Sequence, residues 1–394
     1  MRRLWILVAG TLLSGCTDPE GQSTTTEDGT LVGSTTSTTA TTGTPGTTGS
    51  GTSAGPTSAE QCVTPTEDDH LYPPWPDVPA DCIEDFWVCP LDAGYAEVNP
   101  TTTCNITEGF DPDGEIQAQF WEAYNYARDY FGAYGPVHVY FMGPTSEESN
   151  DDIWHLRAER RAVADACYPV ERQVDDFLNQ PFGLEELDAA NTGDGGYFSI
   201  SGNSSCNPLM DFMMINPRLD EVRSIAMHEY HHVFQVAHEL SHNRESDYGF
   251  NSWIMEGQAT YSAAKFGDET GWGYPFVELM MGMKEYGGNV SPMGIDEYLA
   301  KNTTFDLADE RYWTRPDFSA AVVYYQLGSW AWAYLIHDLD GDVDTALKDF
   351  IIAVPEMGKE ASFELHFGRT IEAFFEEFDV FVQGDDDAWR AILE

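Results

Sequence analysis

The sequence differs in character along its length, and this difference limits where a hydrophobic core can form. Residues 17–59 consist mainly of Thr, Ser and Gly and contain few apolar side chains. Such a segment cannot bury enough apolar surface to offset the conformational entropy that folding costs. We therefore expect residues 16–60 to form a flexible tether, with the folded part of the protein following it in the sequence.

Residues 1–15 have the features of an export signal. Two arginines precede an apolar run over residues 4–13, which is too short to span a bilayer. The run ends in the sequence LSGC, which resembles the lipobox of bacterial lipoproteins. The resemblance implies cleavage before Cys16 and acylation of Cys16, which would anchor the protein to a membrane of the bacterial cell envelope with its folded part outside the cytoplasm. The alternative is an ordinary signal peptide followed by a chance cysteine.

Cysteine usage agrees with export. Beyond the lipobox the protein holds six cysteines, and an even number outside the cytosol favours disulfides. The sequence leaves the pairing open, and we favour Cys82–Cys89 and Cys167–Cys206. Four of the six lie within residues 61–105, a proline-rich stretch that we expect to be a loop-rich, disulfide-stapled segment. No CxxC spacing occurs, which disfavours a cysteine zinc site or a redox motif.

The charge of the protein excludes one class of partner. Asp and Glu number 67 against 19 Lys and Arg, so the formal net charge is −48. Nucleic acids and anionic lipid surfaces are bound through basic surfaces, so neither is expected as the main partner. Hydrophobic residues make up 42% of the sequence, which is enough for a substantial core.

Hydrophobic periodicity predicts an α+β fold for residues 106–394. Within residues 106–217, apolar residues recur with helical spacing over 114–132, and a second helix is expected over 152–167. The runs VHVYFM and MDFMMI, at residues 137–142 and 210–215, are typical of strands. This part is therefore expected to form a small mixed sheet.

The rest of the domain, residues 218–394, has a mainly helical pattern. It contains an uncharged run over residues 320–336, which is shorter than a comfortable membrane span and includes Gln, Gly and Ser. We interpret this run as a buried core helix.

The stretch over residues 224–242, SIAMHEYHHVFQVAHELSH, contains the residues with the clearest chemistry. Its HEYHH sequence places His228 and His232 four residues apart, on one face of a helix. Two imidazoles in that arrangement can bind one Zn²⁺, and Glu229 is then placed to act on a zinc-bound water.

Two alternative metal geometries overlap this helix. A second HExxH begins at His238 and ends at His242, but the residues after it, NRESD, have the composition of a loop, so we favour the first motif. His238 also has the spacing of the third ligand in the metzincin pattern HExxHxxGxxH. There Gln235 replaces the glycine that turns the backbone back toward the metal.

The third ligand is indicated by resemblance. The sequences HEYHHVFQ and WIMEGQATY together resemble the gluzincin metallopeptidases, in particular their peptidase-MA-like branch. The resemblance implies a thermolysin-like fold in which His228, His232 and Glu256 bind one Zn²⁺ per molecule and Glu229 is the general base. Some gluzincins have an Asp four residues after the ligand Glu as a partner for a zinc histidine, and here Thr260 occupies that position.

A second resemblance lies downstream. The sequence YQLG, which begins at Tyr325, resembles the Tyr-x-x-Gly helix of gluzincin aminopeptidases. The resemblance implies that the Tyr325 hydroxyl stabilises the oxyanion, with Tyr324 as the alternative, whereas core packing is the plain interpretation of either ring. By the same analogy, the strand at residues 210–215 is expected to pair with an extended substrate.

The acidic run DLDGDVD at residues 338–344 suggests a calcium loop. An EF-hand loop has Gly at its sixth position and Glu at its twelfth, and those positions here are Val343 and Asp349. The match fails, so we expect a solvated acidic turn between helices in place of a calcium site.

Three functions are compatible with these features. The first is a lipid-anchored, zinc-dependent metallopeptidase that hydrolyses a peptide or protein substrate. The second is a surface-anchored binding module with a vestigial zinc site, and the third is a structural envelope lipoprotein in which the motif is a coincidence. The complete ligand set and Glu229 favour the first, because a vestigial site need not keep its base.

Overall fold

The computed structural model describes residues 62, 64, 102–134, 137–164, 181–193, 197–202, 210–239, 252–287, 293–301 and 322–394. The signal peptide, Cys16, the tether and the cysteine pairs 82–89 and 167–206 all lie outside these residues. Within this described part, no helix is both long enough and apolar enough to cross a membrane.

Four strands form one sheet in the order β1-β2-β4-β3. Their bounds are β1 Thr102–Ile106, β2 Val137–Met142, β3 Tyr197–Gly202 and β4 Met210–Ile215. Strands β1, β2 and β4 are parallel, and β3 runs antiparallel to β4. The sheet is therefore mixed, as the sequence predicts.

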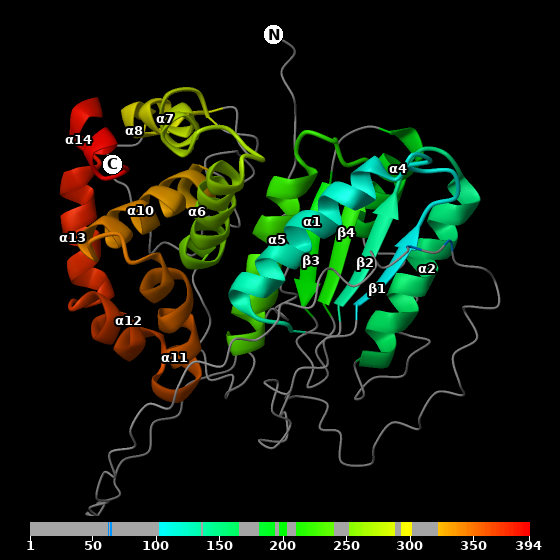
Figure 1. The fold of residues 1–394 in the computed structure, drawn as a ribbon, viewed down its shortest axis with the longest axis horizontal. Coiled ribbons are helices and arrows are strands. Elements are labelled where there is room, and N and C mark those ends of the chain that lie inside the picture. Colours follow the sequence, from blue (N-terminus) through cyan, green and yellow to red (C-terminus); the bar gives the residue numbers. More distant parts are fainter. Residues whose placement is uncertain are drawn as a thin grey trace, which may run out of the picture. The chain divides into compact units, whose positions relative to one another are not determined.

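The first four helices among the described residues cover both faces of this sheet (Figure 1). They are α1 Glu115–Phe131, α2 Glu147–Ala164, α4 Pro181–Thr192 and α5 Val222–Glu239. Side chains alternate between the faces: Val139 and Phe141 of β2 belong to the core shared with α1 and α5, whereas Tyr140 and Met142 pack with α2 and α4. The sheet is thus the middle layer of three.

The remaining elements are helical and follow α5 in the sequence. Their bounds are α6 Ser252–Thr270, α7 Phe276–Tyr286, α8 Ile295–Lys301, η3 Val322–Leu327, α10 Gly328–Asp338, η4 Thr345–Asp349, α11 Phe350–Met357, α12 Lys359–Phe367, α13 Ile371–Phe381 and α14 Asp386–Ala391. Two of them, η3 and η4, are π-helical turns that continue directly into α10 and α11. The structure is mainly helical with a small sheet, which agrees with the α+β prediction.

The described part of the uncharged run, residues 322–336, lies in the core. Trp330 and Trp332 of α10 are fully buried, and Trp332 stacks on Trp253 of α6 with ring centroids 5.6 Å apart. The interpretation as a buried core helix is confirmed.

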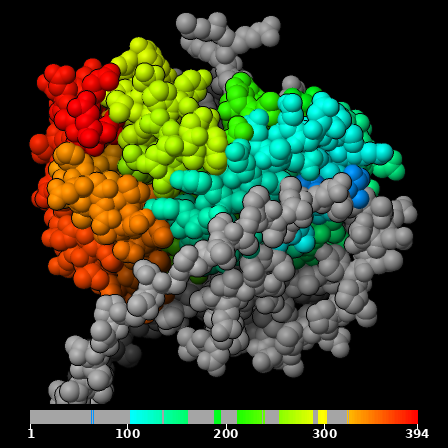
Figure 2. Space-filling model, viewed as in Figure 1, coloured from blue at the N-terminus to red at the C-terminus, as the bar shows by residue number. Residues whose placement is uncertain are grey.

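A lysine links the last helix, α14, to α7 and α8. The ammonium of Lys284 in α7 donates to Asp296 of α8 at 2.7 Å and to Asp386 of α14 at 2.8 Å. It also lies over the ring of Trp389. Figure 2 shows the surfaces of α7 and α8, in yellow, beside that of α14, in red.

Three expectations about the sheet and one about a helix need correction. Strands β1 and β3 are absent from the sequence prediction, and the predicted boundary between residues 105 and 106 falls inside β1. The expectation that β4 pairs with substrate is wrong, because β2 and β3 already bind both of its edges. Helix α2 begins at Glu147, five residues before the predicted start.

One disulfide joins the cysteine-rich segment to the sheet. It links Cys62 to Cys104 of β1, and both side chains are buried. The bond therefore connects the N-terminal limit of the described residues to an edge strand of the sheet.

Candidate metal centre

Helix α5 is fixed against α1 on one side. The Tyr230 hydroxyl donates to the carbonyl of Gly132, at the C-terminal end of α1, over 2.7 Å. Its ring meets that of Tyr124 edge-on at 4.9 Å. Because Tyr230 lies between His228 and His232 in the sequence, this contact turns both histidines away from α1 and toward α6.

Three ligand atoms from α5 and α6 form a nearly equilateral triangle. The Nε2 atoms of His228 and His232 are 3.1 Å apart, and Oε2 of Glu256 lies 3.2 Å from the first and 3.3 Å from the second. A tetrahedral Zn²⁺ with bonds of about 2.0–2.1 Å spaces its ligand atoms about 3.3–3.4 Å apart. The nitrogen and oxygen donors present therefore fit a zinc ion in number, type and spacing.

The structure brings His228 and His232, the histidines of the first HExxH motif, together with Glu256. Among the described residues, these three side chains are the one group of His, Cys, Asp or Glu arranged to hold a metal ion. His238 lies elsewhere: its Nδ1 is 2.8 Å from the carbonyl of Phe234, and its ring contacts Tyr134. The other end of the second motif, at residue 242, lies outside the described residues.

A crossing of two helix backbones determines where α6 lies. A Cβ added to Gly257 would lie 2.5 Å from the carbonyl carbon of Gly328, and one added to Gly328 would lie 2.9 Å from the carbonyl oxygen of Trp253. Only glycine permits so close an approach. Gly257 follows Glu256, and Gly328 lies three residues after Tyr325, so the crossing brings Glu256 and Tyr325 together.

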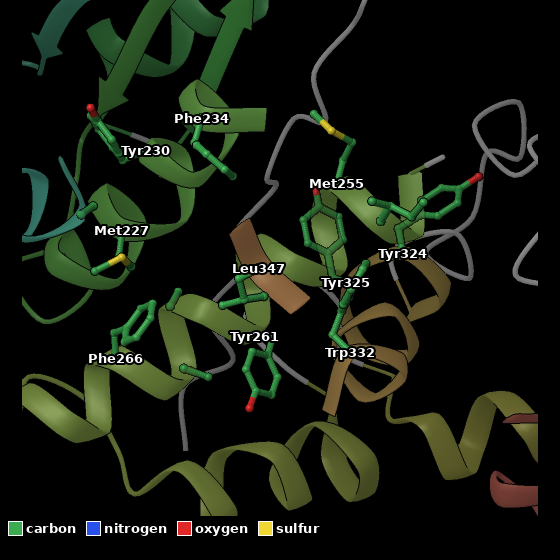
Figure 3. Packing of buried hydrophobic residues seen from close by; sticks show 14 of the residues in the cluster. Met227, Tyr230, Phe234, Met255, Tyr261, Phe266, Tyr324, Tyr325, Trp332 and Leu347 are labelled. Carbon is green, nitrogen blue, oxygen red and sulfur yellow. The ribbon is translucent and has the colours of Figure 1, made fainter. Parts of the chain in front are cut away.

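Tyr325 belongs to the π-helical turn η3 and lies beside the cluster. Its ring is nearly parallel to that of His228, with centroids 6.0 Å apart. Figure 3 shows Tyr325 next to Met255 of α6, whereas Tyr324 points away from it. Of the two predicted tyrosines, Tyr325 is therefore the one at the cluster.

Glu229 is also buried next to the cluster. Burial raises the pKa of Tyr325 well above its usual value, and the charges of Glu256 and Glu229 add to this effect. The Tyr325 hydroxyl therefore keeps its proton and remains a hydrogen-bond donor.

Opposite charges within the cluster shift the pKa values of His232 and Glu256 in opposite directions. Burial alone would lower the pKa of His232, but the charges of Glu256 and Glu229 outweigh it and raise the pKa to about 9. Burial would raise the pKa of Glu256, yet His232 and His228 lower it to about 2. Near neutral pH a protonated imidazole thus faces an ionised carboxylate, in the place where a cation would bind.

Two glutamines behind the cluster were not identified as functional from the sequence. Gln235 and Gln258 are fully buried, and Gln235 Oε1 lies 2.8 Å from Nδ1 of His232. The sequence does contain a signal that could have identified them. Each of the apolar helical stretches HHVFQVAH and WIMEGQATY includes a glutamine, and a buried polar side chain needs a hydrogen-bond partner. Thr260 stands where some gluzincins have an Asp, and its hydroxyl oxygen is buried without a partner in the described part of the molecule.

The acidic turn at residues 338–344 uses several of its carboxylates within the protein. Asp338 pairs with Arg369, Asp342 accepts from the backbone nitrogen of Thr345, and Asp344 accepts from the Tyr130 hydroxyl.

Comparison of the sequence and structure with protein-family models, curated proteins and solved structures found no match. The geometry of the cluster therefore carries the functional argument.

Proposed function

We propose that this protein is a zinc-dependent metallopeptidase of the gluzincin kind, with His228, His232 and Glu256 as ligands of one Zn²⁺. The triangle of ligand atoms carries the proposal, because its spacing suits a tetrahedral ion before any ion is bound. A zinc ion held by these three residues would supply Lewis acidity, for activating water and polarising the substrate carbonyl.

The protein groups then have distinct roles. Glu229 accepts a proton from the attacking water and passes it to the leaving amine. Tyr325 donates a hydrogen bond to the oxygen on which negative charge develops, and its raised pKa keeps that proton in place. Burial of Glu229 and Tyr325 lowers the local dielectric constant, which strengthens both interactions.

The edge strand β3 replaces β4 as the strand proposed to bind substrate. It pairs with β4 on one side, and it contacts α5, which carries the zinc ligands. An extended peptide added to the other side of β3 would form main-chain hydrogen bonds without needing a particular side chain. The proposed substrate class is therefore an extended segment of peptide or unfolded protein.

The test measures zinc content and hydrolysis of an unfolded protein substrate in parallel. We expect one zinc per molecule in the wild type, loss of zinc in His232→Ala, and retention of zinc without hydrolysis in Glu229→Gln. His238→Ala is the matched control, because it removes an imidazole from the same helix outside the cluster. Hydrolysis by Glu229→Gln at the wild-type rate would refute the mechanism, and loss of zinc in His238→Ala would refute the ligand set.

The proposal includes a lipid anchor at Cys16 in the bacterial cell envelope. The lipobox-like sequence supports it, and acylation would hold the enzyme on a membrane while its folded part lies outside the cytoplasm. Incorporation of labelled palmitate should be lost in Cys16→Ser while zinc content is unchanged. Equal labelling of both proteins would refute the anchor and leave the metal site untouched.

A further inference from the structure

A line of hydrogen bonds runs from a backbone carbonyl to the zinc-ligand candidate His232. The Gln258 amide nitrogen donates to the carbonyl of Ala346 over 2.9 Å, and the Gln235 amide nitrogen donates to Oε1 of Gln258 over 2.9 Å. Oε1 of Gln235 in turn lies 2.8 Å from Nδ1 of His232. Both glutamine side chains are fully buried, so no water replaces these contacts.

Backbone carbonyls determine which way each amide points. A carbonyl only accepts, so the group facing Ala346 must be the NH₂ of Gln258, and its oxygen must face Gln235. Gln235 has its own carbonyl contact, because its NH₂ also donates to Met255 at 3.2 Å. Its oxygen is therefore the atom beside His232, and a carbonyl oxygen there accepts a proton from Nδ1.

This orientation selects one form of the imidazole. With its proton on Nδ1, a neutral His232 carries its lone pair on Nε2, the atom that faces His228 and Glu256. The opposite tautomer would place two acceptors, Nδ1 and the Gln235 oxygen, against each other inside the core.

We propose that Gln235 and Gln258 are positioning residues that hold His232 in the tautomer required to bind metal. The proposal rests on the zinc site proposed above and extends it to two side chains that touch no metal. It also links three elements, because the glutamines connect α5 and α6 to the π-helical turn η4. A change in the backbone of η4 would thus be transmitted to the metal ligand.

The neighbouring histidine provides a matched control. Nδ1 of His231 lies 2.8 Å from the Ser262 hydroxyl, which itself donates to the carbonyl of Ala259 and so accepts from the imidazole. This contact is buried like that of His232, but His231 lies outside the ligand cluster. Ser262→Ala removes a buried hydrogen bond to an imidazole that is not a candidate zinc ligand.

The first experiment measures zinc affinity of the full-length protein by competition with a chelator. Gln235→Leu should weaken zinc binding about 10–100-fold, the range typical for loss of a partner of a ligand histidine. Gln235→Met, which has a similar length but no oxygen to accept from Nδ1, should weaken it as much, while Ser262→Ala should leave it unchanged. Wild-type affinity in Gln235→Leu would overturn the proposal, as would wild-type affinity in Gln235→Met, which would indicate a role in packing alone.

The second experiment does not depend on zinc. At a pH above about 9, where His232 is neutral, nitrogen NMR of histidine-labelled, metal-free protein should show a slowly exchanging Nδ1–H and an unprotonated Nε2 for His232, with the signal assigned by its absence in His232→Asn. That signal should disappear in Gln235→Leu and persist in Ser262→Ala. Rapid exchange of the Nδ1 proton in the wild type would overturn the relay. A wild type that shows the signal and binds no zinc would refute the proposed function alone.

Discussion

Replacing Gly257 by alanine tests whether the backbone crossing of α6 and α10 determines the geometry of the proposed metal site. The added Cβ would lie 2.5 Å from the carbonyl carbon of Gly328, whereas ordinary contacts begin at 3.4 Å. The two helices must therefore separate by about 1 Å, because packed backbone atoms cannot compress. Alanine favours a helix over glycine by about 1 kcal/mol, but overpacking costs about 1–3 kcal/mol, so the net effect is destabilising by up to about 2 kcal/mol.

The larger effect of this substitution should be on the site. Glu256 precedes Gly257, so a shift of about 1 Å moves its carboxylate by more than the ~0.2 Å that metal-ligand distances tolerate. We expect zinc affinity to fall at least about tenfold, with a loss of about 1.4 kcal/mol of binding energy or more.

Chelator competition and thermal unfolding of the same samples measure the two effects of Gly257→Ala. Gly282→Ala is the control, because Gly282 lies inside α7 with open space around its Cβ position. That change should raise stability slightly and leave zinc binding unchanged. If Gly257→Ala matched the wild type in both unfolding temperature and zinc affinity, the reasoning about the crossing would be wrong.

Three further results are expected. Tyr325→Phe should lower kcat about 100-fold with little change in KM, because it removes a donor to the transition state, while Tyr324→Phe should have no such effect; steady-state kinetics on a peptide substrate distinguish the two. Zinc affinity should rise about tenfold per pH unit up to about pH 9 and then level off, because His232 must lose its proton to bind metal and its pKa is about 9. A zinc affinity that does not depend on pH below 9 would contradict this. Metal-free protein should lose stability as pH rises through about 9, because a raised pKa stabilises the folded state only while the group is protonated; the fall should be absent from urea unfolding of His232→Gln.

Local pattern predicts the elements that carry the histidines. The spacing of His228 and His232 needs only a helix to place both imidazoles on one face, and α5 is that helix. Glu256 is different, because its approach depends on how α6 packs on α5, which no local spacing encodes. The sequence indicates it only through resemblance, and the structure brings it to the two histidines.

The sheet shows the limit of such prediction. The sequence TTCNI of β1 is polar and short, and it lies at the end of a segment rich in cysteine and proline. Strand order depends on contacts between distant parts of the sequence, so the interior place of β4 was not predictable from its own residues. The partners of Gln235 were hidden for the same reason, since Gln258 and Ala346 are brought to it by tertiary packing.

The disulfide between Cys62 and Cys104 has a consequence for release from a surface. The bond spans 42 residues, so the backbone between the two cysteines is a covalently closed ring attached to β1. A single cut inside that ring leaves both new ends joined through sulfur. Under the proposed anchoring at Cys16, shedding of the folded part by cleavage in this stretch requires reduction as well as proteolysis. A single cut N-terminal to Cys62, in contrast, would suffice.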